Sequence, residues 1–136
     1  MPGAAVPRFD SVTIDCPDPA ALARFYGQLL EWPVPEPAGD AEYVAVDPPG
    51  GGTAINFQRA PGFVAPDWPD PAVQQQMHFD LAVDDLDAAH ERAIALGARL
   101  LDTQEKFRVY ADPAVMRAFW CRQAAKARRS CWTRPT

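Results

Sequence analysis

His78 is the residue of this chain whose side chain is best suited to chemistry near neutral pH, because histidine titrates there. It stands in residues 76–85, QMHFDLAVDD, where apolar and polar residues alternate before two acids. An imidazole in such a place can ligate a metal ion, act as a general base, or hydrogen-bond a ligand from a strand. The residue types alone leave these three roles open.

An earlier copy of this stretch lies 67 residues upstream. Residues 11–18, SVTIDCPD, follow the same plan, and Asp18 falls on Asp85. Where the later copy has His78, the earlier copy has Ser11. A repeat of this size indicates one supersecondary unit used twice.

Four further polar side chains lie on predicted strands, where they could orient a ligand. They are Asn56 and Gln58 in residues 53–59, and Arg108 and Tyr110 in residues 107–111. We consider all four, with His78 and Ser11, to be candidate ligand contacts.

Three residues at the ends of the two first strands have more than one interpretation. Asp15 and Asp80 could reach either a cavity or bulk water, and the sequence does not decide between them. Cys16 has no base near it in the sequence, which favours a buried apolar cysteine over a nucleophile.

The elements that must position these residues follow the repeat. Residues 9–16 alternate as a strand, Asp18 and Pro19 begin a helix, and Trp32-Pro33 ends it. The prolines at 33, 35 and 37 predict an extended or edge-like segment, followed by strands at 43–46 and 53–59.

The second half repeats this order. It predicts strands at 76–83, 98–102, 107–111 and 118–121, and a helix over 86–96 that Gly97 closes. The whole is an α+β domain of two βαβββ modules, whose curved mixed sheets surround a concave pocket. Within this single domain, 1–136, module one spans about 9–59, a linker 60–74, module two about 75–122 and a basic tail 123–136.

Composition excludes several classes of function. The net charge is −5, and all 18 acidic residues precede residue 113, so an acidic body disfavours nucleic acid. We see neither a secretory signal nor an apolar run near the roughly 18 residues of a membrane span. Three cysteines at unpatterned spacing suggest a reducing compartment, so we expect a cytoplasmic protein.

Several ordered motifs together resemble a known family. The chain is similar to the glyoxalase-like branch of the vicinal oxygen chelate superfamily, which includes glyoxalase I, bleomycin resistance proteins and extradiol dioxygenases. The motifs are FDSVTIDCPDP (9–19), ARFY (23–26), WPDP (68–71), QQMHFDL (75–81), VDDL (83–86), LGA (96–98) and VYADP (109–113).

The resemblance implies where a metal would be held. Metal-using relatives place one ligand on the first strand and one on the last strand of each module. The matching positions are Ser11 and His78, then Asn56 or Gln58, and a position near Phe119. Only His78 is a good ligand among them, whereas a catalytic site usually needs about three.

We therefore expect a homodimeric small-molecule-binding protein without a cofactor or intact metal site. The alternative is a divalent-metal-dependent lyase or dioxygenase, in which His78 with Asn56 or Gln58 holds an ion that acts on two adjacent oxygens of a substrate. A third interpretation is an inert interaction protein or the product of a misread gene.

The C-terminal residues motivate this third interpretation. Beyond Pro113 the chain departs from the family pattern, and six of its 13 basic residues, but no acid, follow residue 116. A frame change within 115–136 is our hypothesis; an unshifted gene and a matching mass of the native protein would refute it.

Overall fold

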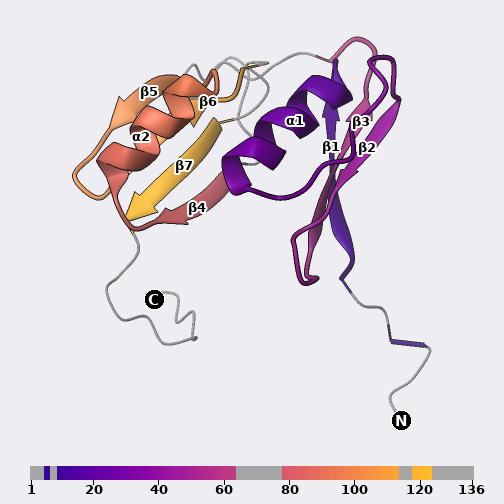
Figure 1. The fold of residues 1–136 in the computed structure, drawn as a ribbon, viewed down its shortest axis with the longest axis horizontal. Coiled ribbons are helices and arrows are strands. Elements are labelled where there is room, and N and C mark those ends of the chain that lie inside the picture. The colour runs from indigo at the N-terminus through magenta and orange to yellow at the C-terminus, as the bar shows by residue number, and fades with distance from the viewer. Residues whose placement is uncertain (1–4, 7–8, 64–77, 114–117, 124–136) are drawn as a thin grey trace.

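The computed structural model describes residues 5–6, 9–63, 78–113 and 118–123. Seven strands and two helices lie in this part of the chain (Figure 1). In order they are β1 (Ser11–Cys16), α1 (Pro19–Leu30), β2 (Tyr43–Val46), β3 (Ala54–Arg59), β4 (Phe79–Val83), α2 (Leu86–Ala95), β5 (Arg99–Thr103), β6 (Phe107–Ala111) and β7 (Ala118–Gln123). The linker tryptophan Trp68 and the tail from residue 124 lie outside the described residues.

The strands form two open mixed sheets with related topologies. Sheet A has the order β1-β3-β2, and sheet B has the order β4-β7-β6-β5. In each sheet the first strand pairs in parallel with the last strand of its module, and the other pairs are antiparallel. The predicted α+β fold with two related modules is confirmed.

Module one has one strand fewer than the predicted plan. No strand forms over residues 32–38, where module two has β5. Pro33, Pro35 and Pro37 have no N–H to donate to a ladder. The segment instead follows α1, to which Arg24 ties it through a hydrogen bond of 2.9 Å to Glu36.

Both helices begin at the aspartates that the sequence predicts as caps. Asp18 accepts a hydrogen bond of 3.2 Å from the Ala21 N–H, and Asp85 accepts one of 2.9 Å from the Asp87 N–H. These bonds satisfy N–H groups that a first turn leaves without a partner. Gly97 follows α2 with a φ of 106°, which fits its predicted role in ending the helix.

The core is shared by the two modules, and Tyr26 of α1 lies at its centre. Its ring stacks on Phe57 of sheet A at 5.7 Å and meets Phe79 of sheet B edge-on at 5.3 Å. The Tyr26 hydroxyl donates a hydrogen bond of 3.0 Å to Asp112, and both residues are buried. Figure 1 shows α1 between the two sheets.

Among the described residues, no helix is long and apolar enough to cross a membrane.

We predict that Tyr26→Phe lowers the free energy of unfolding by about 2 kcal/mol. The variant keeps the stacked ring but removes a hydrogen bond from a buried carboxyl group, which is costly to leave short of donors. Urea denaturation measures the change. Tyr43→Phe is the matched control, because Tyr43 is exposed and its loss of a hydroxyl should change stability by less than about 0.5 kcal/mol. Equal effects of the two substitutions would contradict the assignment.

Candidate functional site

Alternation along the strands of sheet A separates a helix face from an open face. Ile14 and Cys16 of β1 are buried against the core, as is Phe57 of β3. Successive strand residues point to opposite faces, so their neighbours point away from α1. This open face carries Ser11, Thr13 and Asp15 from β1, Ala54, Asn56 and Gln58 from β3, and Tyr43 and Ala45 from β2.

The register arranges these residues in rows across the sheet. Thr13 pairs with Asn56, which pairs with Ala45. In the next row Asp15 pairs with Gln58, which pairs with Tyr43. Asn56 thus lies on the central strand of the open face, with small side chains on both sides.

Asn56 is buried, with only 5% of its surface exposed. No hydrogen bond of its side-chain amide occurs within the described part of the chain. A buried amide that gives up water without gaining a partner costs about 1–3 kcal/mol. Few native polar groups are left in this state, and each calls for an explanation such as a missing ligand or water.

His78 directly precedes β4 in sheet B, and its ring lies beside Asp80. Nε2 of His78 is 3.4 Å from Oδ1 of Asp80, and about a third of the histidine side chain is exposed. Phe79, Leu81 and Val83 alternate with these polar residues and pack on the core. The two polar side chains therefore lie on the face of β4 that is turned away from that core.

Arg108 and Tyr110, which the sequence predicts as ligand contacts, form hydrogen bonds to residues of α2. The Arg108 guanidinium donates hydrogen bonds of 3.1 Å to the Leu86 carbonyl and 2.6 Å to Asp87. The Tyr110 hydroxyl lies 2.9 Å from Nδ1 of His90, and burial raises the pKa of Tyr110. Their strand was predicted, but the sequence did not show which of its faces the helix covers.

Phe119 is fully buried and stacks on Tyr110 at 5.2 Å, so it belongs to the helix side of sheet B. The register also changes the counterpart of Asn56. Asn56 pairs with Thr13, and the repeat equivalent of Thr13, Asp80, pairs with Trp120. The position that the family resemblance implies near Phe119 therefore falls on Trp120, and a shift of one residue exchanges the faces of a strand.

The residues present do not fit the divalent ion that the family resemblance implies. Ser11 offers a neutral hydroxyl and Phe119 offers no donor atom. Nowhere among the described residues do three histidine, cysteine, aspartate or glutamate side chains gather around a possible ion. A catalytic metal usually needs about three protein ligands.

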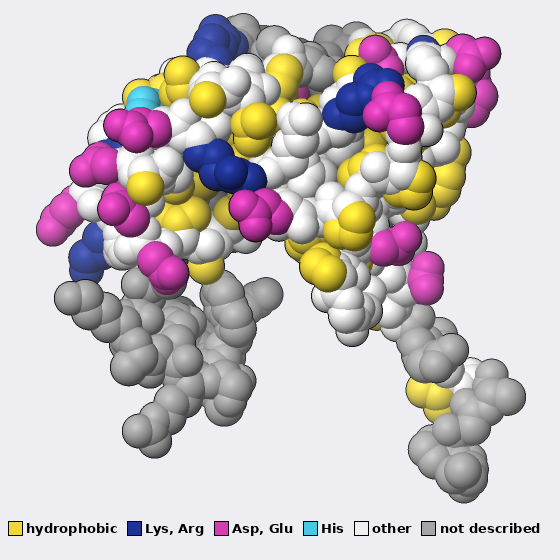
Figure 2. Space-filling model, viewed as in Figure 1, with side chains coloured by type: hydrophobic (Ala, Val, Ile, Leu, Met, Phe, Trp, Pro, Cys, Tyr) yellow, Lys and Arg dark blue, Asp and Glu magenta, His cyan; other side chains and the backbone are white. Residues whose placement is uncertain are grey.

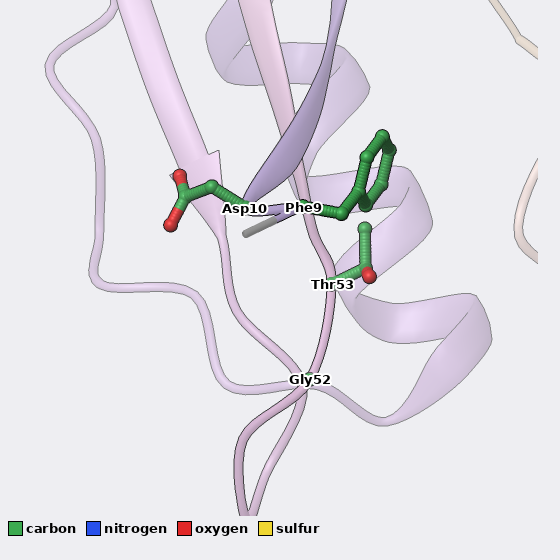
Figure 3. Close-up of a pocket in the computed structure, with 4 residues that line it drawn as sticks. All are labelled: Phe9, Asp10, Gly52 and Thr53. Atoms are coloured by element: carbon green, nitrogen blue, oxygen red, sulfur yellow. The ribbon is translucent and has the colours of Figure 1, made fainter. Parts of the chain in front are cut away.

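A hollow of about 580 Å³ lies at the end of sheet A where β1 begins. It is lined by Phe9, Asp10, Gly52 and Thr53, and none of the six predicted ligand contacts lines it. In Figure 3 the Asp10 carboxylate points away from Phe9 and Thr53. These side chains do not converge on one point, so we do not assign the site to this hollow.

Charged side chains on the helix-bearing side are paired with each other. Arg24 lies 2.9 Å from Glu36, and Arg92 lies 3.4 Å from Glu31. Figure 2 shows this side of the molecule, with cationic side chains beside acidic ones. These charged side chains form ion pairs on the surface and near the ends of the helices, and we do not assign them to a site.

Comparison with known proteins places the chain in a family. The model of the glyoxalase-like domain family matches residues 11–118. The chain therefore belongs to the glyoxalase-like domain family, within the vicinal oxygen chelate superfamily. No curated protein sequence matches the chain.

Solved structures of low sequence identity share the fold. A glyoxalase/bleomycin resistance protein/dioxygenase family enzyme from Burkholderia phytofirmans is 18% identical, with a TM-score of 0.66 over 86% of this chain and 98% of that one. A glyoxalase/dioxygenase from Nostoc punctiforme is 16% identical, with a TM-score of 0.62 over 93% and 99% of the two chains. TnmS3, an antibiotic binding protein from Streptomyces, is 18% identical, with a TM-score of 0.55 over 90% and 100%.

The buried thiols of Cys16 and Cys121 should make the free energy of unfolding fall as the pH rises into the alkaline range. Burial raises the pKa of each from its ordinary 9.0 to about 11, which confirms Cys16 as a buried apolar cysteine. Because unfolded thiols release their protons at lower pH, this contribution to stability is complete below about pH 9 and is lost as pH rises to about 11.

We predict that a Cys16→Ala/Cys121→Ala variant loses less stability than the parent between pH 9 and pH 11. Urea denaturation at intervals of half a pH unit gives the free energy of unfolding of each protein, and its slope against pH is compared between the two. The parent and variant should differ little in slope between pH 7 and pH 8.5, which serves as the internal control. Identical slopes above pH 9 would contradict the raised thiol pKa values.

Proposed function

We propose that this chain binds a small organic molecule against the open face of sheet A. The observation that carries the proposal is the Asn56 amide, which is buried on that face without a hydrogen-bond partner in the described chain. A bound molecule would supply the missing partner, so the cost of burial in the free protein becomes a gain on binding. Small-molecule sites typically combine an apolar surface with a few placed polar groups.

Neighbouring residues extend this polar anchor. Gln58 lies one row further along β3, and Ser11 lies near the start of β1 on the same face. In module two, His78 lies beside Asp80 directly before β4 and is a further candidate ligand contact. The description of TnmS3 as an antibiotic binding protein supports binding as a function that this fold can perform. A homodimer and a cytoplasmic location stay predictions.

A metal-dependent enzyme was the alternative left open by the sequence. We infer instead that the chain works without a tightly held divalent ion, since the described residues do not supply a set of ligands. We expect protein purified without chelator to carry less than about 0.1 metal ion per chain, because a site with one good ligand cannot hold a divalent ion tightly. Elemental analysis measures this ratio, with His78→Ala as control. One metal ion per chain that is lost in His78→Ala would overturn this inference.

We predict that Asn56→Leu raises the free energy of unfolding by about 1 kcal/mol, or the melting temperature by about 3 °C. The substitution removes an amide that lacks a partner and keeps the branching of the side chain. Asn56→Ala separates this effect from any overpacking. Gln58→Leu is the control, because its exposed position should change stability by less than about 0.5 kcal/mol. A loss of stability in both Asn56 variants would show that the amide is already satisfied.

The same variants test binding. A thermal-shift screen of hydrophobic antibiotics and other small organic molecules should find compounds that stabilise the parent protein, by mass action. The apparent affinity for these compounds should be at least about tenfold lower in Asn56→Leu, because the site then lacks the group that hydrogen-bonds the compound. Compounds that stabilise the parent and Asn56→Leu equally would place binding elsewhere.

A further inference from the structure

We propose that the molecule bound on the open face of sheet A carries a protonated amine next to an aromatic or aliphatic group. Asp15 would be the counter-ion of the amine, and the ring of Tyr43 would provide the second contact. The inference rests on the proposed function and adds to it the charge class of the ligand.

The register places the two contacts at opposite ends of one row. Asp15 of β1 pairs with Gln58 of β3, and Gln58 pairs with Tyr43 of β2. Adjacent strands lie about 4.8 Å apart, so the backbones of Asp15 and Tyr43 are separated by roughly 10 Å. Both side chains point to the same face, with the Gln58 amide between them. This spacing suits an organic molecule of one or two rings.

The chemistry of the pair selects for positive charge. A carboxylate attracts an ammonium group directly, and an aromatic ring attracts it through the negative face of its π-system. Tyr43 is 51% exposed, although it is a large side chain on a regular strand. Within the described chain, Asp15 forms no ion pair or hydrogen bond through its carboxylate, so this charge is not used by the fold.

The distribution of cations argues against an anionic ligand. Four of the six described arginines each lie within 3.4 Å of a glutamate or aspartate. They are Arg24, Arg59, Arg92 and Arg108. The open-face positions of β1, β2 and β3 carry no lysine or arginine. A ligand carboxylate or phosphate would therefore meet Asp15 without a compensating cation from the described strands of sheet A.

Asn56 provides independent support for a ligand on this face. It lies in the adjoining row, two residues before Gln58 on the same strand, and is buried without a partner in the described chain. Its carbonyl can accept an N–H of the amine, and its NH₂ can donate to a ligand oxygen. The exposed polar side chains around it can be satisfied by water, but a side chain with 5% exposure has little access to it.

Three probes of one shape and different charge test the inference. They are 2-phenylethylamine, 2-phenylethanol and 3-phenylpropanoate, which are cationic, neutral and anionic at pH 7. Titration of each into the full-length protein, followed by two-dimensional NMR of the backbone amides, gives affinity and location together. We expect the amine to bind at least about fivefold more tightly than the alcohol, and the anion to bind most weakly. The preference should shrink as salt is added.

Two pairs of variants identify the contacts. Asp15→Asn should lower the affinity for the amine about fivefold and leave the alcohol unchanged. Its matched control is Asp40→Asn, which removes the same charge from an exposed turn before β2. Tyr43→Leu should weaken the amine about threefold, whereas Tyr43→Phe keeps a ring and should retain binding.

The outcomes separate this inference from the proposed function. Equal affinities for the three probes, no effect of Asp15→Asn, or no saturable amine binding up to about 20 mM would each overturn the charge class. If the neutral probe still binds and Asn56→Leu lowers its affinity, the proposed binding face is supported and the preference for an amine is refuted. If Asn56→Leu leaves the binding of every probe unchanged, the proposed function itself fails.

Discussion

The side chain of Tyr26 is the point on which the arrangement of the two modules depends. Its ring contacts Phe57 of one sheet and Phe79 of the other, and its hydroxyl bonds to Asp112 beyond the end of β6. Both sheets must therefore turn the same kind of surface toward α1. Because successive side chains of a strand point to opposite faces, the residues between those that pack on the core point to solvent or to a ligand.

This constraint explains how far the sequence could predict the site. The repeat, the capping aspartates and the alternation around Ile14 and Cys16 are local patterns, and the structure agrees with them. Which face of a later strand meets a helix is set by pairing between distant segments. Arg108 and Tyr110 point to one face of β6 and Val109 to the other, and the residue types do not show which face a helix covers. Only the packing of α2 decides the role of Arg108 and Tyr110.

Register and proline account for the other two differences. Phe119 and Trp120 are neighbours in the sequence, and the family pattern alone could not tell which of them pairs across from Asp80. The missing strand of module one could be anticipated only in part. Three prolines at alternate positions still permit an extended chain, but they leave it without the donors that would hold it in a sheet. Arg24 and Glu36 then hold that segment to the helix instead.

The two sides of sheet A also differ in how their polar groups are satisfied. On the helix side, arginines and capping aspartates have partners at hydrogen-bond distance, and those bonds stabilise the fold. On the open face, Asn56 is buried at a cost that the fold does not recover within the described chain. A buried polar group without a partner in the described chain, at the centre of the face that the core leaves open, is the feature on which the proposed binding function rests.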